Sequence, residues 1–475
     1  MTFNYFIQCP VCDTVTRMRS PGGYIYKTPV RIHCGKCNTL LTGSFISDSD
    51  NGKTYYSPDN CKEVTARHYD YYGEASGEVL CRKITYLPDE GLTIPSTISP
   101  AMAFLMSIDL EERDDFINYA CHLTTLENNW DKERILFDLY RKGRDALLKD
   151  RYSHVAVSRG YNLDNKVSIL CYVYYCYFSV VGGVFTKREL TKKLQSLNYE
   201  INHIDRTELF SFVTYLQKDD RLQKAQEKMF DAMNSFVGIS SYLVPALGAM
   251  RYREPDLIDK STYGLSTCSF DDIRFFYLDA FEDLSDFCDI ILGLNNIKYR
   301  NHYDSFGTKL NMEKLMGQKK GNRVKLLSTR ECFSSLFSLR NDSNELRNAI
   351  GHKNANYEGI KQTIEYIPNI QKPSDVKNAY LLDVAIQCIE LMRSSVMLSM
   401  IIYKLLFLLY RDDKAPAQLH PIFYAGVKSS SRCPCGSGLP YRRCCKPYVS
   451  KYKKGYKAIE IEEYANTAFD LSNIE

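Results

Sequence analysis

The chain has 475 residues, of which 44% are hydrophobic and 25% are charged, an ordinary balance for a folded soluble protein. This length exceeds that of a typical single domain, so two to four domains are expected. The formal net charge is only +4, which excludes strong whole-protein attraction to nucleic acid. Any affinity for RNA or DNA must therefore come from local basic patches.

Cysteine usage indicates the cellular compartment. The chain holds 17 cysteines, an odd number, with two tight clusters near its ends. Such clusters favour a reducing compartment and metal sites over disulfides. The opening residues, MTFNYFIQCPVC, lack the basic start and apolar centre of a signal peptide. We therefore expect a cytoplasmic protein.

Residues 1–90 are predicted to form a small β domain, because short runs such as YIYKTPVRIHC lie among Gly, Asn, Asp and Pro. Two C-x-x-C pairs lie within it. They are Cys9 with Cys12 and Cys34 with Cys37. Zinc takes four soft ligands in a tetrahedron, and each pair supplies two thiolates from one turn. The pattern predicts a structural zinc ribbon, since no βαβ pattern surrounds the pairs as in a redox protein.

Residues 91–250 are predicted to form a helical scaffold. A proline-rich linker, 87–100, is followed by apolar residues at spacings of three and four. The segment 167–186, VSILCYVYYCYFSVVGGVFT, has no charge, but it contains four tyrosines and a Gly182-Gly183 break. We interpret it as a buried helix that ends at these glycines, and we expect no membrane association.

Residues 251–415 are predicted to form a helical bundle. Ser269 can cap a helix that carries Asp271 and Asp272 in its first turn, followed by an apolar stripe to residue 291. A second helix is expected over 329–339, and a long closing helix over 378–410.

A polar segment, ELRNAIGHKNANYE (345–358), lies within this bundle. The preceding Asp-Ser-Asn-Glu has the form of a capping box, which predicts a helix from about Ser343 to Gly351. Five residues of unbroken helix turn by roughly 500°, so Arg347 and His352 would point about 140° apart. Either the helix ends between them or a second chain completes the pair. Alternatively, this is a short solvated helix whose arginine bonds an acid.

The R-N-x-x-x-H pattern of Arg347, Asn348 and His352, following a helix rich in acids, resembles the HEPN family over about residues 260–411. These helical-bundle domains include many metal-independent ribonucleases of bacterial toxin and antiphage systems. The resemblance implies catalytic roles for the three residues and a homodimer that joins two motifs. It also implies that an acid on the first helix orients the arginine. The candidates are Asp279, Glu282, Asp283 and Asp286, of which Asp283 is preferred.

The same residue types suit RNA cleavage. Attack by the ribose 2′-hydroxyl requires a proton acceptor that works near neutral pH, which histidine supplies. It also requires a fixed cation on the phosphate, and the planar fork of arginine fits two phosphate oxygens. Asn348 would orient His352 or a phosphate oxygen. No metal is needed for this step.

The run RCPCGSGLPYRRCCKP (432–447) is too short to build an apolar core, so a metal must hold it. Its four cysteines are Cys433, Cys435, Cys444 and Cys445. The run resembles the SEC-C motif, the zinc module at the C-terminus of the translocation ATPase SecA, apart from Pro440 at a usually basic position. The resemblance implies docking to a protein partner or ribosome, and the basic residues also suit RNA phosphates. We expect the motif to stand apart from the helical body.

Together these patterns predict a mainly α protein. Its expected segments are a zinc ribbon (1–90), a helical scaffold (91–250), an HEPN-like bundle (251–415), a SEC-C motif (429–448) and a polar tail (449–475), with two structural zinc ions. The leading hypothesis is a metal-independent endoribonuclease of a bacterial defence or toxin system, with RNA as substrate. The alternative is a non-catalytic HEPN-like adaptor that binds protein or nucleic acid through its zinc modules.

Overall fold

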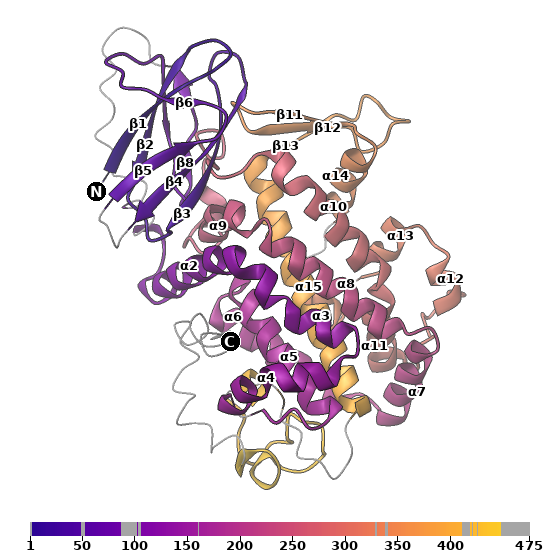
Figure 1. Ribbon diagram of the computed structural model, residues 1–475. Coiled ribbons are helices and arrows are strands. Elements are labelled where there is room, and N and C mark those ends of the chain that lie inside the picture. The colour runs from indigo at the N-terminus through magenta and orange to yellow at the C-terminus, as the bar shows by residue number, and fades with distance from the viewer. Residues whose placement is uncertain are drawn as a thin grey trace. The chain divides into compact units, whose positions relative to one another are not determined.

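The computed structural model describes residues 2–48, 53–86, 102, 106–159, 161–327, 330–337, 341–410, 419, 421–424 and 426–447. The chain is mainly helical, and most of its strands lie before residue 90 (Figure 1). One cluster of four cysteines lies in the N-terminal β region and another near the C-terminus. The predicted fold class is therefore confirmed.

The chain forms two compact units, each assembled from three stretches of sequence. The ribbon unit comprises Met1–Asn129, Ser235–Asp279 and Asp342–Glu390, and the helical unit comprises Trp130–Asn234, Ala280–Asn341 and Leu391–Glu475. Every boundary between these stretches falls within a helix. The division into five consecutive segments stays a prediction.

The strands of the ribbon unit form four small sheets, ordered β6-β1-β2-β7-β9, β3-β4-β5, β10-β8 and β11-β12-β13. Every pairing is antiparallel except that of β2 with β7. The strands are β1 (Thr2–Gln8), β2 (Val15–Pro21), β3 (Lys27–His33), β4 (Leu40–Asp48), β5 (Lys53–Pro58), β6 (Lys62–Glu63), β7 (Tyr71–Glu74), β8 (Cys81–Arg82), β9 (Thr85–Tyr86), β10 (Tyr263–Gly264), β11 (Ala355–Glu358), β12 (Thr363–Tyr366) and β13 (Lys377–Tyr380).

The two larger sheets share one apolar core. Side chains alternate across a strand, so every second residue of β1, β3 and β4 is buried. Tyr5 and Ile7 of one sheet belong to the same buried cluster as Val30, Ile32 and Phe45 of the other. Burying each such side chain stabilises the fold by about 1.5–3 kcal/mol.

The helical segments of the ribbon unit come from α2 (Leu110–Glu133), α9 (Ser240–Ala249), α10 (Phe270–Asp286), α14 (Asn341–Gly351) and α15 (Leu381–Tyr410). Arg31 attaches β3 to the start of α10. Its backbone N–H donates to the Ser266 carbonyl at 2.7 Å, and its guanidinium Nε lies 3.7 Å from Asp272 Oδ1. Asp272 also accepts hydrogen bonds from the backbone and hydroxyl of Ser269. The β3-β4-β5 sheet and the first turn of α10 are therefore held together by polar contacts.

The helical unit contains most of the longer helices. They are α3 (Ile135–Arg141), α4 (Asp145–Ser158), α5 (Lys166–Val181), α6 (Lys187–His203), α7 (Arg206–Gln217), α8 (Arg221–Val237), α11 (Cys288–Arg300), α12 (Met312–Met316) and α13 (Lys320–Lys325), with the C-terminal part of α15. As predicted, α5 ends immediately before Gly182. Two segments, Lys166–Val184 and Leu381–Tyr410, are long and apolar enough to span a membrane, but 89% of each is buried, as in the core of a soluble protein.

The second helix of the predicted bundle differs from expectation. Within 329–339, the described residues 330–337 contain only a 3-10 helix, Ser334–Leu336. The partner of α10 along the chain is instead α11, which continues the apolar stripe after a break at Phe287. The backbone of Phe287, with φ −108° and ψ 17°, leaves the helical region and separates the two helices.

Glu133 leads to a prediction about pH. This buried side chain has an oxygen, Oε2, without a hydrogen-bond partner among the described residues, and burial raises its pKa to about 8. The folded chain therefore keeps a proton that the unfolded chain, with a glutamate pKa of about 4.3, has lost. Stability should fall as the pH rises from about 4.3 to 8, and Glu133→Gln should weaken this dependence. Thermal denaturation at pH 5 and pH 8 measures it.

In that experiment, Glu133→Gln should exceed the wild-type melting temperature by more at pH 8 than at pH 5. Glu227→Gln, an exposed substitution on α8, is the matched control. An equal difference at both pH values would contradict the assignment of a buried, protonated carboxyl.

Candidate metal centres and the Arg347–His352 segment

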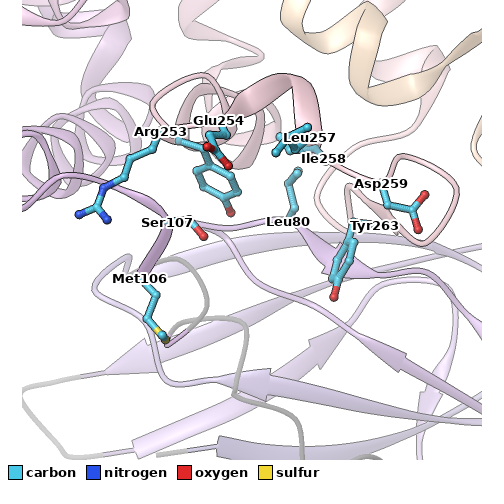
Figure 2. A pocket seen from close by; sticks show the side chains of 10 residues that line it. Leu80, Met106, Ser107, Arg253, Glu254, Leu257, Ile258, Asp259 and Tyr263 are labelled. Atoms are coloured by element: carbon cyan, nitrogen blue, oxygen red, sulfur yellow. The ribbon is translucent and has the colours of Figure 1, made fainter.

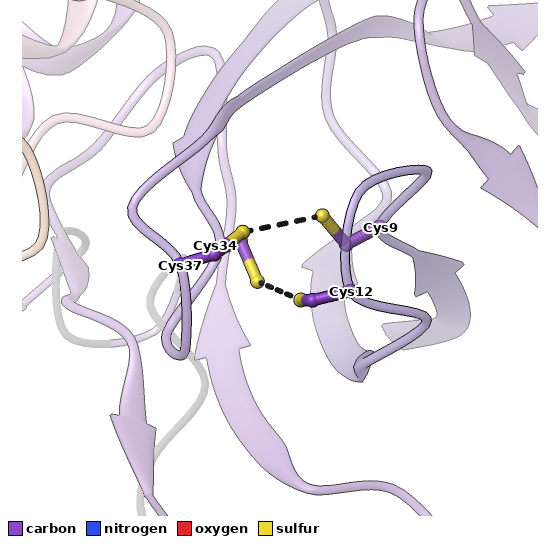
Figure 3. A group of neighbouring side chains, drawn as sticks. All are labelled: Cys9, Cys12, Cys34 and Cys37. Atoms are coloured by element: carbon purple, nitrogen blue, oxygen red, sulfur yellow. Dashed lines mark hydrogen bonds between the residues drawn. The ribbon is translucent and has the colours of Figure 1, made fainter.

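The N-terminal quartet lies at the ends of two hairpins (Figure 3). The four sulfur atoms lie within 4.8 Å of one another, with Cys9 Sγ 3.6 Å from Cys37 Sγ and Cys12 Sγ 3.5 Å from Cys34 Sγ. Zinc–sulfur bonds of about 2.3 Å in a tetrahedron place sulfurs roughly 3.8 Å apart, whereas a disulfide bond is only about 2.05 Å long. The quartet therefore fits four thiolates around one metal ion.

The two C-x-x-C turns, or knuckles, have the same backbone conformation. The N–H of Asp13 donates to the Cys9 carbonyl at 3.0 Å, and that of Asn38 donates to the Cys34 carbonyl at 2.9 Å. Asp13 and Asn38 both adopt a left-handed conformation, with φ of 58° and 59°, which short polar side chains tolerate. Each C-x-x-C pair is followed by Asp or Asn and then Thr. This repeated signal is visible in the sequence.

The two threonines act on the second thiol of each knuckle. Thr14 Oγ1 lies 3.2 Å from Cys12 Sγ, and Thr39 Oγ1 lies 3.1 Å from Cys37 Sγ. These hydrogen bonds lower the pKa of the Cys12 thiol, and they lower the pKa of Cys37 to about 6. Burial instead raises the pKa of Cys34 to about 12. The hydrogen bonds from the threonines therefore favour the thiolate form that a metal requires.

The ribbon site is continuous with the β core. Cys9 and Cys34 are buried in the same cluster as the apolar residues of β1 and β3. A Cβ atom at Gly35 would lie 2.2 Å from the Tyr71 ring, so this close approach requires glycine. Metal binding at the knuckles is thus coupled to packing of both sheets.

The C-terminal quartet is equally compact. Its four sulfurs lie within 4.8 Å of one another, with Cys444 Sγ 3.4 Å from Cys435 Sγ and 3.8 Å from Cys445 Sγ. Gly436 and Gly438 have φ of 77° and 78°, a conformation that favours glycine and turns the chain around the site. Both quartets can hold a metal ion, and an all-thiolate donor set suits zinc.

The prediction that this motif stands apart from the body is wrong, because it packs within the helical unit. The ammonium group of Lys404, fully buried on α15, donates to Asn198 Oδ1 at 2.8 Å and to the carbonyl of Pro434. A Cβ atom at Gly436 would lie 3.2 Å from a methyl group of Leu408. A buried ammonium requires acceptors, and the backbone of the motif supplies one.

The Arg347–His352 segment lies in the ribbon unit. As predicted, α14 ends between the two residues, at Gly351. The side chain of His352 is exposed, and its backbone N–H donates to the Asn348 carbonyl at 3.0 Å. Lys353, with φ of 59°, then turns the chain toward β11. The three-stranded sheet β11-β12-β13 follows this turn.

Arg347 is half-buried, and its guanidinium donates to Asn348 Oδ1 at 2.8 Å. Burial lowers the pKa of this arginine. Asn348 therefore contacts Arg347 in the structure. From the sequence it was predicted to orient His352 or a phosphate oxygen. Glu345, the acid two residues before the arginine, accepts a hydrogen bond from Lys377 at 2.6 Å.

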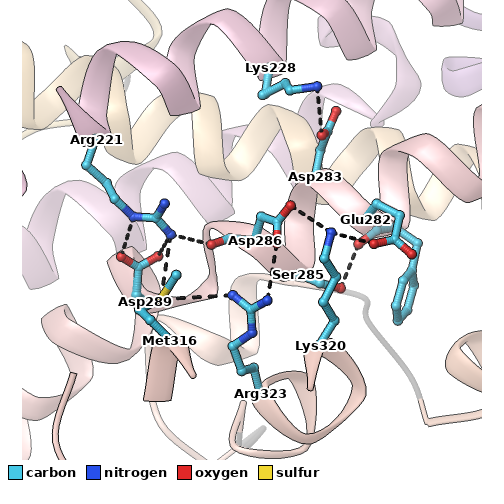
Figure 4. Close-up of polar contacts among 11 residues, drawn as sticks. Arg221, Lys228, Glu282, Asp283, Ser285, Asp286, Asp289, Met316, Lys320 and Arg323 are labelled. Atoms are coloured by element: carbon cyan, nitrogen blue, oxygen red, sulfur yellow. Dashed lines mark hydrogen bonds and ion pairs between the residues drawn. The ribbon is translucent and has the colours of Figure 1, made fainter. Parts of the chain in front are cut away.

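Asp283, the acid preferred as the arginine's partner, lies in the helical unit. Figure 4 shows it facing Lys228, whose ammonium is 3.3 Å from Asp283 Oδ1. The neighbouring acids also have basic partners. They pair as Glu282 and Asp286 with Lys320, Asp286 with Arg323, and Asp289 with Arg221. These pairs connect α10 and α11 with α8 and α13, and a catalytic role for Asp283 stays a prediction.

The ribbon unit also contains a cavity of about 610 Å³ beside residues 252–263 (Figure 2). No sequence pattern pointed to it, because its walls come from distant segments. Arg253 on its rim pairs with Asp109 at 2.8 Å. Hydrogen bonds from Ser261 lower the pKa of Asp259 to about 2. Arg253 therefore already has an ion-pair partner, and the carboxylate of Asp259 already accepts hydrogen bonds.

Comparisons with known proteins support one part of the chain. No family model and no solved structure match it. Over 30 residues it is 57% identical to the protein translocase subunit SecA of Acidothermus cellulolyticus, which is 6% of this chain and 3% of that protein. This similarity, together with the C-terminal quartet, supports a SEC-C-type zinc motif. It covers too little of SecA to carry over an activity.

Elemental analysis of the purified protein should find two zinc ions per chain. Cys9→Ser and Cys444→Ser should each lose one ion and lower the melting temperature, because one quartet is part of the β core and the other covers Lys404. Cys332→Ser, outside both quartets, is the control and should keep both ions. An unchanged melting temperature for Cys444→Ser would show that the packed motif adds no stability.

Proposed function

We propose that the protein cleaves RNA, without a metal in the reaction, at a site formed by Arg347 and His352. One observation carries the proposal. Helix α14 holds the half-buried Arg347 against Asn348 and ends at Gly351, which leaves His352 exposed beyond the helix. An anchored cation and an accessible imidazole are the two groups that 2′-hydroxyl attack needs. The resemblance of this segment to HEPN ribonucleases also supports the proposal.

In this reaction His352 accepts the proton of a ribose 2′-hydroxyl. The 2′-oxygen attacks the adjacent phosphorus, and the bond from phosphorus to the 5′-oxygen breaks. The departing oxygen takes a proton from water or from a second acid. The products are a 2′,3′-cyclic phosphate and a 5′-hydroxyl end. Arg347 donates to the phosphate oxygens while negative charge develops, and Asn348 limits the orientations of its guanidinium.

The two zinc sites have a structural role in this proposal. Four thiolates complete a tetrahedron and leave no position for water or substrate, as in structural zinc sites. The proposed setting is a bacterial defence or toxin system.

The second candidate is an adaptor that binds a protein or nucleic acid through its zinc modules. The C-terminal motif supports it, because four basic side chains around the quartet are exposed. They are Lys428, Arg432, Arg442 and Arg443. A metal-bound basic surface suits an acidic protein, a ribosome or an RNA backbone. Cleavage of RNA by the purified protein distinguishes the two candidates.

Substitution of either proposed catalytic residue tests the leading function. Arg347→Ala and His352→Ala should each lower the rate of RNA cleavage by about 10²- to 10⁴-fold. Neither side chain is buried in the apolar core, so the melting temperature should change little. Cleavage is measured with a labelled RNA and the ends are analysed for cyclic phosphate. His154→Ala, another exposed histidine, is the control.

Wild-type cleavage should also survive brief exposure to EDTA. A strict requirement for added magnesium would contradict the mechanism. Unfolding of both single variants would instead favour a structural role for the segment.

We also expect a homodimer that joins two Arg347–His352 segments. If each site takes its arginine and histidine from different chains, mixing Arg347→Ala and His352→Ala chains should restore one intact site in each mixed dimer. Light scattering gives the oligomeric state, and the labelled-RNA assay gives the recovered activity. An active monomer would exclude the composite site.

A further inference from the structure

A second cavity of the ribbon unit, about 440 Å³ in volume, collects basic and hydroxyl side chains. Its walls come from the end of β8, the turn before β10, and the β11-β12-β13 sheet. Three cations line it, Arg82, Lys83 and Lys361. Ser261 and Thr363 add hydroxyl groups. Its size falls within the range of small-molecule sites.

Hydrogen bonds fix the walls before any ligand binds. Lys83 is the central link, since its ammonium donates to the carbonyls of Lys260 at 2.7 Å and Lys361 at 2.6 Å. Its backbone N–H donates to the Thr262 carbonyl at 3.0 Å. The same ammonium lies 4.9 Å from the centre of the Tyr380 ring. Lys83 therefore acts as a structural element of the cavity wall.

A second link joins the β11–β12 turn to β10. The side-chain amide of Gln362 donates to the Leu265 carbonyl at 2.6 Å and accepts from the Leu265 N–H at 2.9 Å. A Cβ atom at Gly264 would lie 2.1 Å from this amide oxygen, so glycine is needed for the contact. The cavity is thus preformed, which reduces the cost of ordering on binding.

The remaining two cations have no counter-ion among the residues that the structure describes. Across the described part of the chain, neither Arg82 nor Lys361 forms an ion pair through its side chain. The carboxylates nearby already have partners. Asp383 pairs with Lys260 at 2.6 Å, and Glu358 accepts the backbone N–H of Lys361 at 2.7 Å. Asp259, at the neighbouring turn, accepts from Ser261.

We propose that this cavity binds the phosphate of a nucleotide. Arg82 and Lys361 would bind phosphate oxygens, and the hydroxyl of Thr363 would donate to them. Ile84, Ile360 and Tyr380 provide an apolar wall for the base or sugar. Either a free nucleotide or one nucleotide of an RNA strand has this chemistry. The assignment rests on the cavity itself and goes beyond the proposed cleavage reaction.

Binding is tested on the full chain carrying His352→Ala, so that RNA is not consumed during the measurement. Calorimetric titrations use inorganic phosphate, AMP, ATP and a short single-stranded RNA. Arg82→Ala and Lys361→Ala, each added to this background, should weaken binding by about tenfold or more, since each removes a charge-assisted contact. Lys372→Ala, an exposed lysine outside the cavity, is the matched control and should bind normally.

Weakened binding of AMP or ATP in the two variants would identify a free nucleotide as the ligand. Weakened binding of the RNA alone would identify a nucleotide of a strand. Lys361→Arg, which keeps the charge in an exposed turn, should restore binding and guards against a folding defect in Lys361→Ala. No saturable binding, or binding equal in Arg82→Ala, Lys361→Ala and wild type, overturns the proposal. Because cleavage is not measured, failure of the proposed function would leave this result intact.

Discussion

Convergence of four thiols at the ends of two hairpins is the constraint on which the ribbon unit depends. Cys9 and Cys12 follow one strand, and Cys34 and Cys37 follow another, so their sulfurs can meet only when the hairpins are aligned. The same strands carry the buried side chains of both sheets. Metal coordination and β packing therefore stabilise one arrangement together. Arg31 lies on the strand that leads to Cys34. Its contacts with Ser266 and Asp272 connect this arrangement to the first turn of α10.

The C-terminal motif belongs to the helical unit through a different interaction. A lysine in the middle of an apolar helix would be strongly destabilising without acceptors. Lys404 donates to the side-chain oxygen of Asn198 on α6 and to the backbone carbonyl of Pro434 in the motif. The exposed basic residues of the motif remain available, whereas three of its cysteines, Cys433, Cys435 and Cys445, are buried.

In the Arg347–His352 segment, the end of α14 separates the two residues that are proposed to act on RNA. Its arginine is held on the helix by Asn348, whereas its histidine lies beyond the last turn. The chain then enters β11 and the turn that carries Lys361. The proposed reaction and the proposed nucleotide cavity therefore belong to consecutive stretches of the ribbon unit. Both proposals use cations to bind phosphate.

Local pattern was sufficient for several features. The spacing of cysteines predicted both metal quartets, the apolar run before Gly182 predicted α5, and Gly351 marked the end of α14. Each depends on residues close in sequence, where turn geometry and helix periodicity act directly. Contacts between distant residues could not be predicted in this way. The acceptors of Lys404, the ion pair of Asp283 with Lys228, and the cavity around Arg82 and Lys361 were decided only by tertiary packing, because they join segments that no local periodicity relates.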